Sequence, residues 1–205
     1  MTLSDYKDLA SRLLQPVVSA GVRAGLTPNQ VSIISFCVAV VAAVTYYFAT
    51  PVSYFVAGVL VVTSGLLDVV DGEIAREMGA GSKRGDFLDH VLDRYSDMVI
   101  VGGIAAGLGS WLLGVAALTG VFLTSYMGTQ AQAVGGGREY GGLLGRADRM
   151  AIISGGSVVQ AGVRISKVEL AYFSPLGWVL VVIAVVGNLT AIQRFVGTWR
   201  ELDGS

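Results

Sequence analysis

The stretch AGLTPNQVSIISFCVAVVAAVTYYFATPVSYFVAGVLVVTSGLL, residues 24–67, contains no charged side chain. A second uncharged stretch covers residues 98–137. An α-helix needs about 20 apolar residues to cross a hydrocarbon core of about 30 Å, so each stretch is long enough for two crossings. The sequence therefore predicts an all-α, polytopic membrane protein.

The composition of the 205-residue chain agrees with this class. Hydrophobic residues make up 53% of the chain and charged residues only 14%, whereas a soluble domain carries about 25% charged residues. The formal net charge of −1 gives no electrostatic reason to expect a nucleic-acid partner. Cys37 is the single cysteine of the chain, which excludes an intrachain disulfide.

We expect one domain over residues 1–205, in which an interfacial helix precedes a bundle of six transmembrane helices at about 30–198. Residues 4–24 carry apolar side chains at every third or fourth position, a pattern typical of an amphipathic helix that lies in the membrane interface. The alternative is a packed soluble helix. The expected spans are about 30–49, 52–67, 87–107, 111–133, 148–165 and 170–194.

The placement of the basic residues predicts the orientation in the cell membrane. If six spans start from a cytoplasmic N-terminus, twelve of the fourteen Lys and Arg residues lie on the cytoplasmic side or at its edge. Arg164 and Lys167 are the two that fall outside. Within the third span, Gly103 and Gly107 lie one helical turn apart and predict a close helix approach, either within the chain or between two copies.

Acidic residues are concentrated where the second and third spans meet. Asp68 and Asp71 lie three positions apart, and Asp89 and Asp93 lie four positions apart, so each pair shares one helix face. Because a short turn joins the two spans, the two carboxylate faces can meet. Eight of the fifteen acidic residues belong to this region: Asp68, Asp71, Glu73, Glu77, Asp86, Asp89, Asp93 and Asp97.

Counting from Pro51, Asp68 lies just inside the cytoplasmic boundary of the membrane. Four carboxylates near that boundary need compensating positive charge. Inserting one carboxylate into a membrane helix costs about 2.5–3.5 kcal/mol, and the four would also repel one another. Oxygen ligands without a Cys or His cluster favour Mg²⁺ or Mn²⁺, and two such ions would suit an in-line phosphoryl displacement. The alternative is a network of salt bridges with Arg76, Lys83, Arg84 and Arg94.

The pattern Asp68-x2-Asp71-Gly72-x2-Ala75-Arg76-x8-Gly85-x3-Asp89-x3-Asp93 resembles the complete signature of the CDP-alcohol phosphotransferase family. The resemblance implies transfer of a phosphatidyl-type group from a CDP-linked lipid to a small alcohol, with release of CMP, by a homodimeric enzyme at the lipid bilayer. It implies that the metal ligands are Asp68, Asp71, Asp89 and Asp93. Asp93 would also be the catalytic base, and the CDP site would be lined by Gly72, Ala75, Arg76 and Gly85.

A second group of arginines bears on the acceptor alcohol. Arg138, Arg146 and Arg149 precede the fifth span, and Arg194 ends the sixth. If they face the cytoplasmic cavity, Arg146, Arg149 and Arg194 would bind a small acceptor that carries a phosphate. The alternative is that they only follow the positive-inside rule.

The acceptor remains open between two phosphorylated alcohols. Ser125-Tyr126, the segment 145–149 and Gln193-Arg194 resemble the branch of the family that accepts inositol phosphate, although the chain has Gly128 and Gln130 where many of that branch have basic residues. Glycerol phosphate is the alternative acceptor. A cation transporter or channel is the alternative class, and it predicts carboxylates near mid-membrane or along several helices.

Overall fold

The computed structural model describes residues 14–135, 144–168 and 172–203. All regular secondary structure within these ranges is helical, which confirms the all-α prediction. A short helix over residues 14–23 precedes α2 (Pro28–Tyr47), α3 (Pro51–Glu77), α4 (Lys83–Leu108), α5 (Trp111–Ala133), α6 (Arg146–Ile165) and α7 (Pro175–Asp203).

Local sequence signals set several helix boundaries. Thr27 and Thr50 cap the N-termini of α2 and α3, and a proline follows each of them at the start of the helix. Proline fits there because the first N–H groups of a helix have no partner within the helix. Gly109 follows the end of α4 with a φ of 64°, a left-handed conformation that glycine adopts without a steric penalty.

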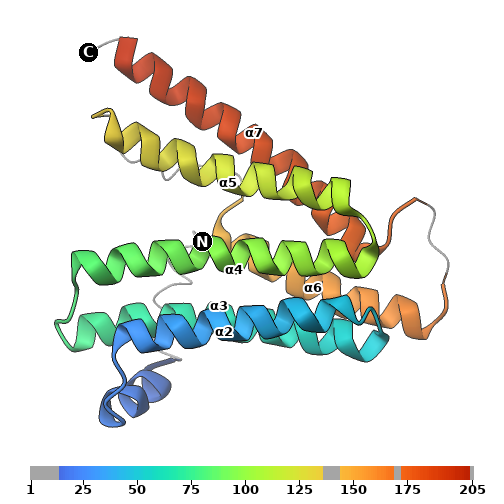
Figure 1. Cartoon of the computed structure of the whole chain (residues 1–205), viewed down its shortest axis with the longest axis horizontal. Coiled ribbons are helices and arrows are strands. Elements are labelled where there is room, and N and C mark those ends of the chain that lie inside the picture. Colours follow the sequence, from blue (N-terminus) through green and yellow to red (C-terminus); the bar gives the residue numbers. More distant parts are fainter. Residues whose placement is uncertain (1–13, 136–143, 169–171, 204–205) are drawn as a thin grey trace.

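The six helices α2 to α7 form a closed ring, in the spatial order α2, α3, α6, α7, α5, α4 (Figure 1). We name the end of the ring where α3 ends and α4 begins the acidic end. Toward this end, α5 and α7 stay paired but diverge from α4 (Figure 1). Residues of α4, α5, α6 and α7 line a common space near the acidic residues.

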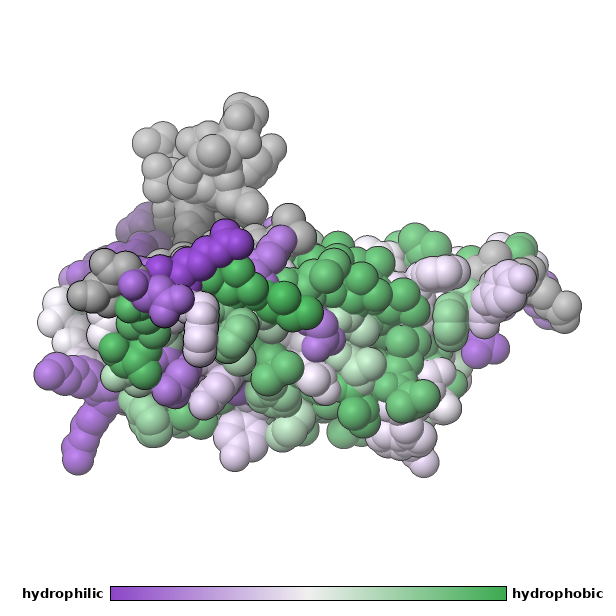
Figure 2. Space-filling view, turned by 90° about the horizontal axis from the view of Figure 1, so that it is seen from above, coloured by the Kyte–Doolittle hydropathy of each residue, from purple (hydrophilic) through white to green (hydrophobic). Residues whose placement is uncertain are grey.

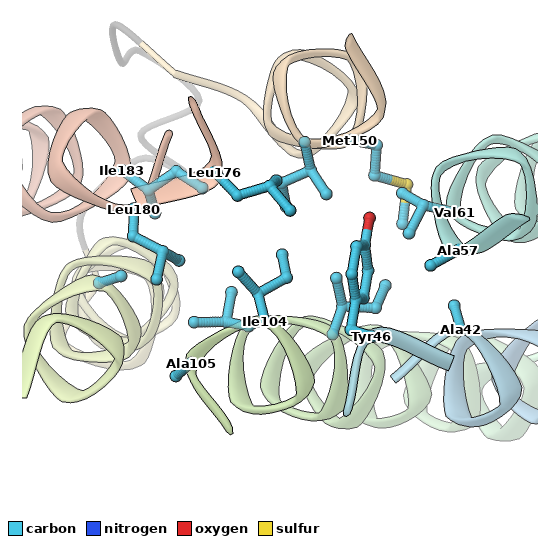
Figure 3. Packing of buried hydrophobic residues seen from close by; sticks show 14 of the residues in the cluster. Ala42, Tyr46, Ala57, Val61, Ile104, Ala105, Met150, Leu176, Leu180 and Ile183 are labelled. Carbon is cyan, nitrogen blue, oxygen red and sulfur yellow. The ribbon is translucent and has the colours of Figure 1, made fainter. Parts of the chain in front are cut away.

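Buried apolar side chains fill the inside of the ring. Figure 3 shows Tyr46 of α2 directed toward Val61 of α3 and Met150 of α6, while Ile104 of α4 and Leu180 of α7 approach from the other side. The Tyr46 hydroxyl lies 2.5 Å from Oγ of Ser157, so its polar atom is paired inside the apolar core.

Close contact between α2 and α4 depends on glycine. A Cβ atom added at Gly103 would lie 2.5 Å from the carbonyl oxygen of Ala43, and one at Gly107 would collide with the backbone of Tyr46. The two glycines therefore serve packing within the chain, one of the two roles expected from their spacing.

The outer surface of the ring is apolar. Large hydrophobic side chains such as Val52 and Leu112 are exposed, and Figure 2 shows apolar residues over most of the visible face, with hydrophilic residues gathered toward the acidic end. Within the described ranges, α2, α3, α5 and α7 are long and apolar enough to cross a membrane. The two remaining long helices, α4 and α6, carry several charged side chains at the acidic end.

The helix over residues 14–23 packs against the acidic end of the ring. Val18 is fully buried and forms a small apolar cluster with Val31 of α2 and with Val70 and Ile74 of α3. Residues 4–13 of the expected interfacial helix lie outside the described residues. The expected spans fall on the helices α2 to α7, but two of these helices are displaced or longer: α3 continues beyond 67 to Glu77, and α7 begins at Pro175 and continues to Asp203.

Candidate active site

Three signature carboxylates converge at the acidic end. Asp68 and Asp71 of α3 and Asp89 of α4 each place one carboxylate oxygen within 4.8 Å of the other two. The residues fit a divalent cation because three anionic oxygen ligands from two helices face one small space. The meeting of the two carboxylate faces, expected from the spacing, is thus observed.

Asp71 is held by a residue of a third helix. Its Oδ2 accepts a 2.7 Å hydrogen bond from Oγ of Ser32 on α2, and both side chains are buried. A hydrogen bond of this kind fixes the orientation of a metal-binding carboxylate. Sequence reasoning did not find Ser32, since a serine on an apolar helix carries no signal of a contact 39 positions away.

Asp93 lies on the same face of α4 as Asp89 but is tied to α6. Nη1 of Arg146 lies 2.6 Å from Oδ1 of Asp93 and also pairs with Asp68. Arg94, named in the salt-bridge alternative, is more distant, with Nη2 3.8 Å from Oδ2 of Asp93. The arginine in close contact with the signature aspartates is therefore Arg146, and it comes from the second group of basic residues.

A cavity of about 200 Å³, here named the signature cavity, lies between the start of α2, the end of α3 and the start of α4. It is lined by Asp71, Gly72, Ala75, Gly85 and Asp89, among others. A Cβ atom at Gly72 would meet no atom within 4 Å, so the backbone there is open to a ligand.

Arg76, expected with the glycines of the signature cavity, takes a different position. Its side chain is 75% exposed and pairs with Glu73 one turn earlier on α3. Its guanidinium thus stays at the surface of the acidic end, whereas Gly72, Ala75 and Gly85 line the cavity itself.

A second cavity of about 280 Å³, here named the arginine cavity, lies between α4, α5, α6 and α7. Asp93, Arg146, Arg149 and Arg194 line it, together with His90, Arg94, Thr124 and Ser125. The three arginines expected to bind an acceptor phosphate are thus brought together beside Asp93. Arg138 lies outside the described residues.

Two of these arginines are fixed by hydrogen bonds. Nη2 of Arg149 donates to Oδ2 of Asp97 at 2.8 Å, and Nη1 of Arg194 donates to the carbonyl oxygen of Thr124 at 2.8 Å. Asp97 belongs to the acidic group of the sequence, but nothing in the spacing showed that it would contact α6.

A third cavity of about 500 Å³, here named the apolar groove, lies between α3 and α6. Val62, Leu66 and Met150 contribute to its apolar walls, and Asp68, Asp93 and Arg146 stand at its polar end. Asp93 and Arg146 also line the arginine cavity, so the two spaces share a wall.

Together, the four signature aspartates connect three spaces. Asp71 and Asp89 line the signature cavity, Asp68 and Asp93 line the apolar groove, and Asp93 also lines the arginine cavity. A cation bound by these aspartates would lie between a polar ligand in the signature cavity, an apolar ligand in the apolar groove and an anionic ligand in the arginine cavity. It does not match a transporter, because these carboxylates gather at one end of the ring rather than along a path through it.

The fold and the site define an all-helical, multi-pass membrane protein with a clustered carboxylate centre. Residues 25–199 match the family model described as CDP-alcohol phosphatidyltransferase. The chain belongs to this family, and the protein is a CDP-alcohol phosphatidyltransferase.

Similar proteins match most of the chain. Archaetidylinositol phosphate synthase of Pyrococcus horikoshii is 32% identical over 180 residues, which are 87% of this chain and 87% of that protein. Phosphatidylinositol phosphate synthase of Mycolicibacterium smegmatis is 35% identical over 195 residues, 89% of this chain and 82% of that protein.

Solved structures show the same fold. The crystal structure of Mycobacterium tuberculosis phosphatidylinositol phosphate synthase with CDP-DAG bound has a TM-score of 0.77 and 26% identity, covering 92% of this chain and 94% of that chain. The structure of the same protein in complex with manganese and citrate has a TM-score of 0.76 and 27% identity, covering 90% and 88%. The manganese in that related structure agrees with a divalent metal in the carboxylate centre of this chain.

Proposed function

We propose that the enzyme transfers a phosphatidyl-type group from a CDP-linked lipid to a hydroxyl of inositol phosphate, with release of CMP. The arginine cavity beside Asp93 carries this proposal. Within the described part of the chain, Nε and Nη2 of Arg146 are buried and make no hydrogen bond, so two guanidinium donors remain for an anion. The relatives that match most of the chain act, by their names, in the synthesis of inositol phosphate lipids.

The carboxylate centre would hold two divalent cations, Mg²⁺ or Mn²⁺. Asp68, Asp71 and Asp89 would bind one ion, and Asp93 would complete the ligand set of the second. When bound, the ions neutralise the pyrophosphate and the departing CMP. The manganese in the related M. tuberculosis structure and the oxygen-only ligand set support this assignment.

The CDP-linked lipid would occupy two of the three spaces. The nucleotide would lie in the signature cavity, where Gly72 and Gly85 leave the helix backbone accessible and Ala75 adds little bulk, with Arg76 available at the surface for phosphate contact. The lipid chains would follow the apolar groove, whose walls are apolar except at its end near Asp68 and Asp93.

The acceptor would occupy the third space, the arginine cavity. Arg146, Arg149 and Arg194 bind its phosphate, which places the attacking hydroxyl near Asp93. Oxygen of this hydroxyl forms a bond to the lipid-bearing phosphorus, the bond from that phosphorus to the bridging oxygen breaks, and CMP leaves with the bridging oxygen. The hydroxyl proton passes to the carboxylate of Asp93, whose orientation is fixed by the contact with Arg146.

We also propose the arrangement in the membrane. All six helices α2 to α7 would span the cell membrane as one domain, with the N-terminus and the acidic end in the cytoplasm. The charged side chains of α4 and α6 are compatible with spanning because Arg146 and Arg149 of α6 pair with Asp93 and Asp97 of α4. The enzyme would act as a homodimer, which chemical crosslinking in membranes can test.

A product screen tests the acceptor. Purified protein is incubated with CDP-DAG, Mg²⁺ or Mn²⁺ and one of four alcohols: inositol phosphate, glycerol phosphate, serine or free inositol. We expect CMP release and a new lipid with inositol phosphate, and a larger increase of the acceptor KM than of the CDP-DAG KM for Arg194→Ala. Turnover with glycerol phosphate alone would replace the proposed acceptor, and turnover with free inositol alone would exclude a phosphate-binding role for the arginines.

A further inference from the structure

Asp97 is a buried acidic residue with no role in the family signature. It lies on α4 one turn beyond Asp93, and its side chain is 6% exposed. Among the described residues, the lining of the arginine cavity includes Arg94 and Arg149 but not Asp97. Asp97 therefore lies behind the cavity wall rather than in it.

Within the described ranges, Asp97 forms two ion pairs, each with an arginine of that wall. Its Oδ2 accepts the 2.8 Å hydrogen bond from Nη2 of Arg149, and Nη1 of Arg94 lies 3.6 Å from the same oxygen. Arg149 is itself buried. A buried guanidinium is stable only with a paired opposite charge, and a fixed partner also limits its rotamers.

The contact between Asp97 and Arg149 crosses the inside of the ring. Arg149 belongs to α6, whose neighbours in the ring are α3 and α7, whereas Asp97 belongs to α4, which packs mainly between α2 and α5. Helix packing alone thus leaves the direction of the Arg149 side chain open. The hydrogen bond to Asp97 directs the Arg149 side chain toward α4.

Arg146 is oriented by a separate set of contacts. It pairs with Asp68 and Asp93, so its position depends on the carboxylate centre. The two arginines on the first turns of α6 are therefore held by different groups. Asp97 acts on Arg146 only through its charge at longer range, so a change at Asp97 removes the hydrogen bond of Arg149 and leaves the ion pairs of Arg146 with Asp68 and Asp93 in place.

We propose that Asp97 is a positioning residue for the acceptor: it holds the guanidinium of Arg149 at the wall of the arginine cavity, where the remaining N–H groups face the acceptor phosphate. This inference rests on the proposed function, since it requires an acceptor that carries a phosphate. It assigns to Asp97 an effect on acceptor binding alone, separate from the metal centre and the CDP site.

A double-mutant cycle tests the inference. The variants are Asp97→Asn, Arg149→Gln and the two together, with Glu77→Gln as the control that removes an exposed acidic charge near the same end. The KM of inositol phosphate, the KM of CDP-DAG and the Mn²⁺ concentration for half-maximal rate are measured for each protein. We expect Asp97→Asn and Arg149→Gln each to raise the acceptor KM about tenfold to 100-fold, as for loss of a charged hydrogen bond.

The double variant decides the outcome. If Asp97 acts through Arg149, the acceptor KM of the double variant equals that of Arg149→Gln, and the CDP-DAG KM and the Mn²⁺ requirement stay within about twofold of wild type. If the two increases multiply, or if Asp97→Asn weakens both substrates equally, the inference is wrong. Should Asp97→Asn fold poorly because Arg149 is left unpaired, Asp97→Glu, which keeps the charge but moves the carboxylate, takes its place in the cycle, and an unchanged acceptor KM in Asp97→Glu contradicts the inference.

An error in the proposed function can be distinguished from an error in the role of Asp97 by the acceptor that the wild-type protein uses. If wild-type protein uses glycerol phosphate and not inositol phosphate, the proposed acceptor is wrong, and the same cycle with glycerol phosphate still decides the role of Asp97. If wild-type protein uses only an alcohol without a phosphate, both the acceptor and the role of Asp97 are overturned.

Discussion

Asp93 differs from the other three signature aspartates in the cavities that it lines. Asp68, Asp71 and Asp89 form the close group of oxygens, whereas Asp93 faces both the arginine cavity and the apolar groove. A carboxylate between the acceptor space and the lipid space is in position to take a proton from the attacking hydroxyl.

Asp93→Asn is therefore expected to lower turnover, while the ion held by Asp68, Asp71 and Asp89 still supports binding of the CDP-linked lipid. Loss of a general base reduces the rate about 10²- to 10⁴-fold. CMP release measures the rate, and the thermal shift produced by CDP-DAG measures binding. Unchanged turnover would show that another group accepts the proton.

Ser32 offers a test of the carboxylate centre without removing a ligand. Ser32→Ala deletes the hydrogen bond to Asp71, and loss of such a supporting contact weakens metal affinity about 10- to 100-fold. The Mn²⁺ concentration for half-maximal rate should rise accordingly.

Ser35→Ala is the matched control for Ser32→Ala. Ser35 lies almost one turn further along the same helix, is also buried, and bonds to the carbonyl oxygen of Ser64 at 2.8 Å. It should leave the metal requirement unchanged. An equal shift in both variants would mean that α2 packing, rather than the Asp71 contact, is being measured.

At this scale the sequence predicted the site in part. The spacing of Asp68, Asp71, Asp89 and Asp93 is a local property of two helices joined by a short turn, so it can be read from the chain. The partners Ser32 and Asp97 could not be found in this way, because their contacts to Asp71 and Arg149 span 39 and 52 positions and depend on how whole helices pack.

At the scale of helices, the contact between α2 and α4 makes a direct prediction. Gly103→Ala places a Cβ atom 2.5 Å from the carbonyl oxygen of Ala43, a backbone atom that cannot move without shifting α2. Overpacking of this kind costs about 1–3 kcal/mol, so the melting temperature in detergent should fall.

Gly102→Ala is the control at the neighbouring position. A Cβ atom there would meet no atom within 4 Å, so the melting temperature should stay the same or rise slightly, because alanine favours the helix. Equal destabilisation by both variants would contradict the packing described between α2 and α4.

Helix boundaries were predictable where a local signal exists. The Thr–Pro pairs at 27–28 and 50–51 and the turn at Gly109 carry their own capping chemistry. The end of α7 carries no such signal, and the helix continues through Phe195 and Trp199, which pack together beyond the expected span 170–194.

At the scale of the whole molecule, the orientation is open to labelling. In a Cys37→Ser background, Lys83→Cys marks the first residue of α4 at the acidic end, and Ser166→Cys marks the opposite end after α6. Both positions are exposed. A membrane-impermeant thiol reagent on intact cells should label Ser166→Cys and leave Lys83→Cys unlabelled until the cells are opened. The reverse pattern would place the acidic end outside.

The closed ring explains why the sequence predicts the class of membrane protein but only part of the active site. Uncharged stretches and basic residues indicate spans and orientation from the chain alone. The three spaces around the aspartates arise when α6 closes the ring between α3 and α7 and brings Arg146 and Arg149 to Asp93 and Asp97 of α4. No pattern within α6 contains that information.

Anomalous X-ray scattering from crystals grown with Mn²⁺ tests the carboxylate centre most directly. We expect a strong anomalous peak in contact with the carboxylate oxygens of Asp68, Asp71 and Asp89, and its loss in crystals of Asp71→Asn. Well-ordered crystals at saturating Mn²⁺ whose anomalous density lies elsewhere, with these three side chains empty of metal, would contradict the metal-dependent site.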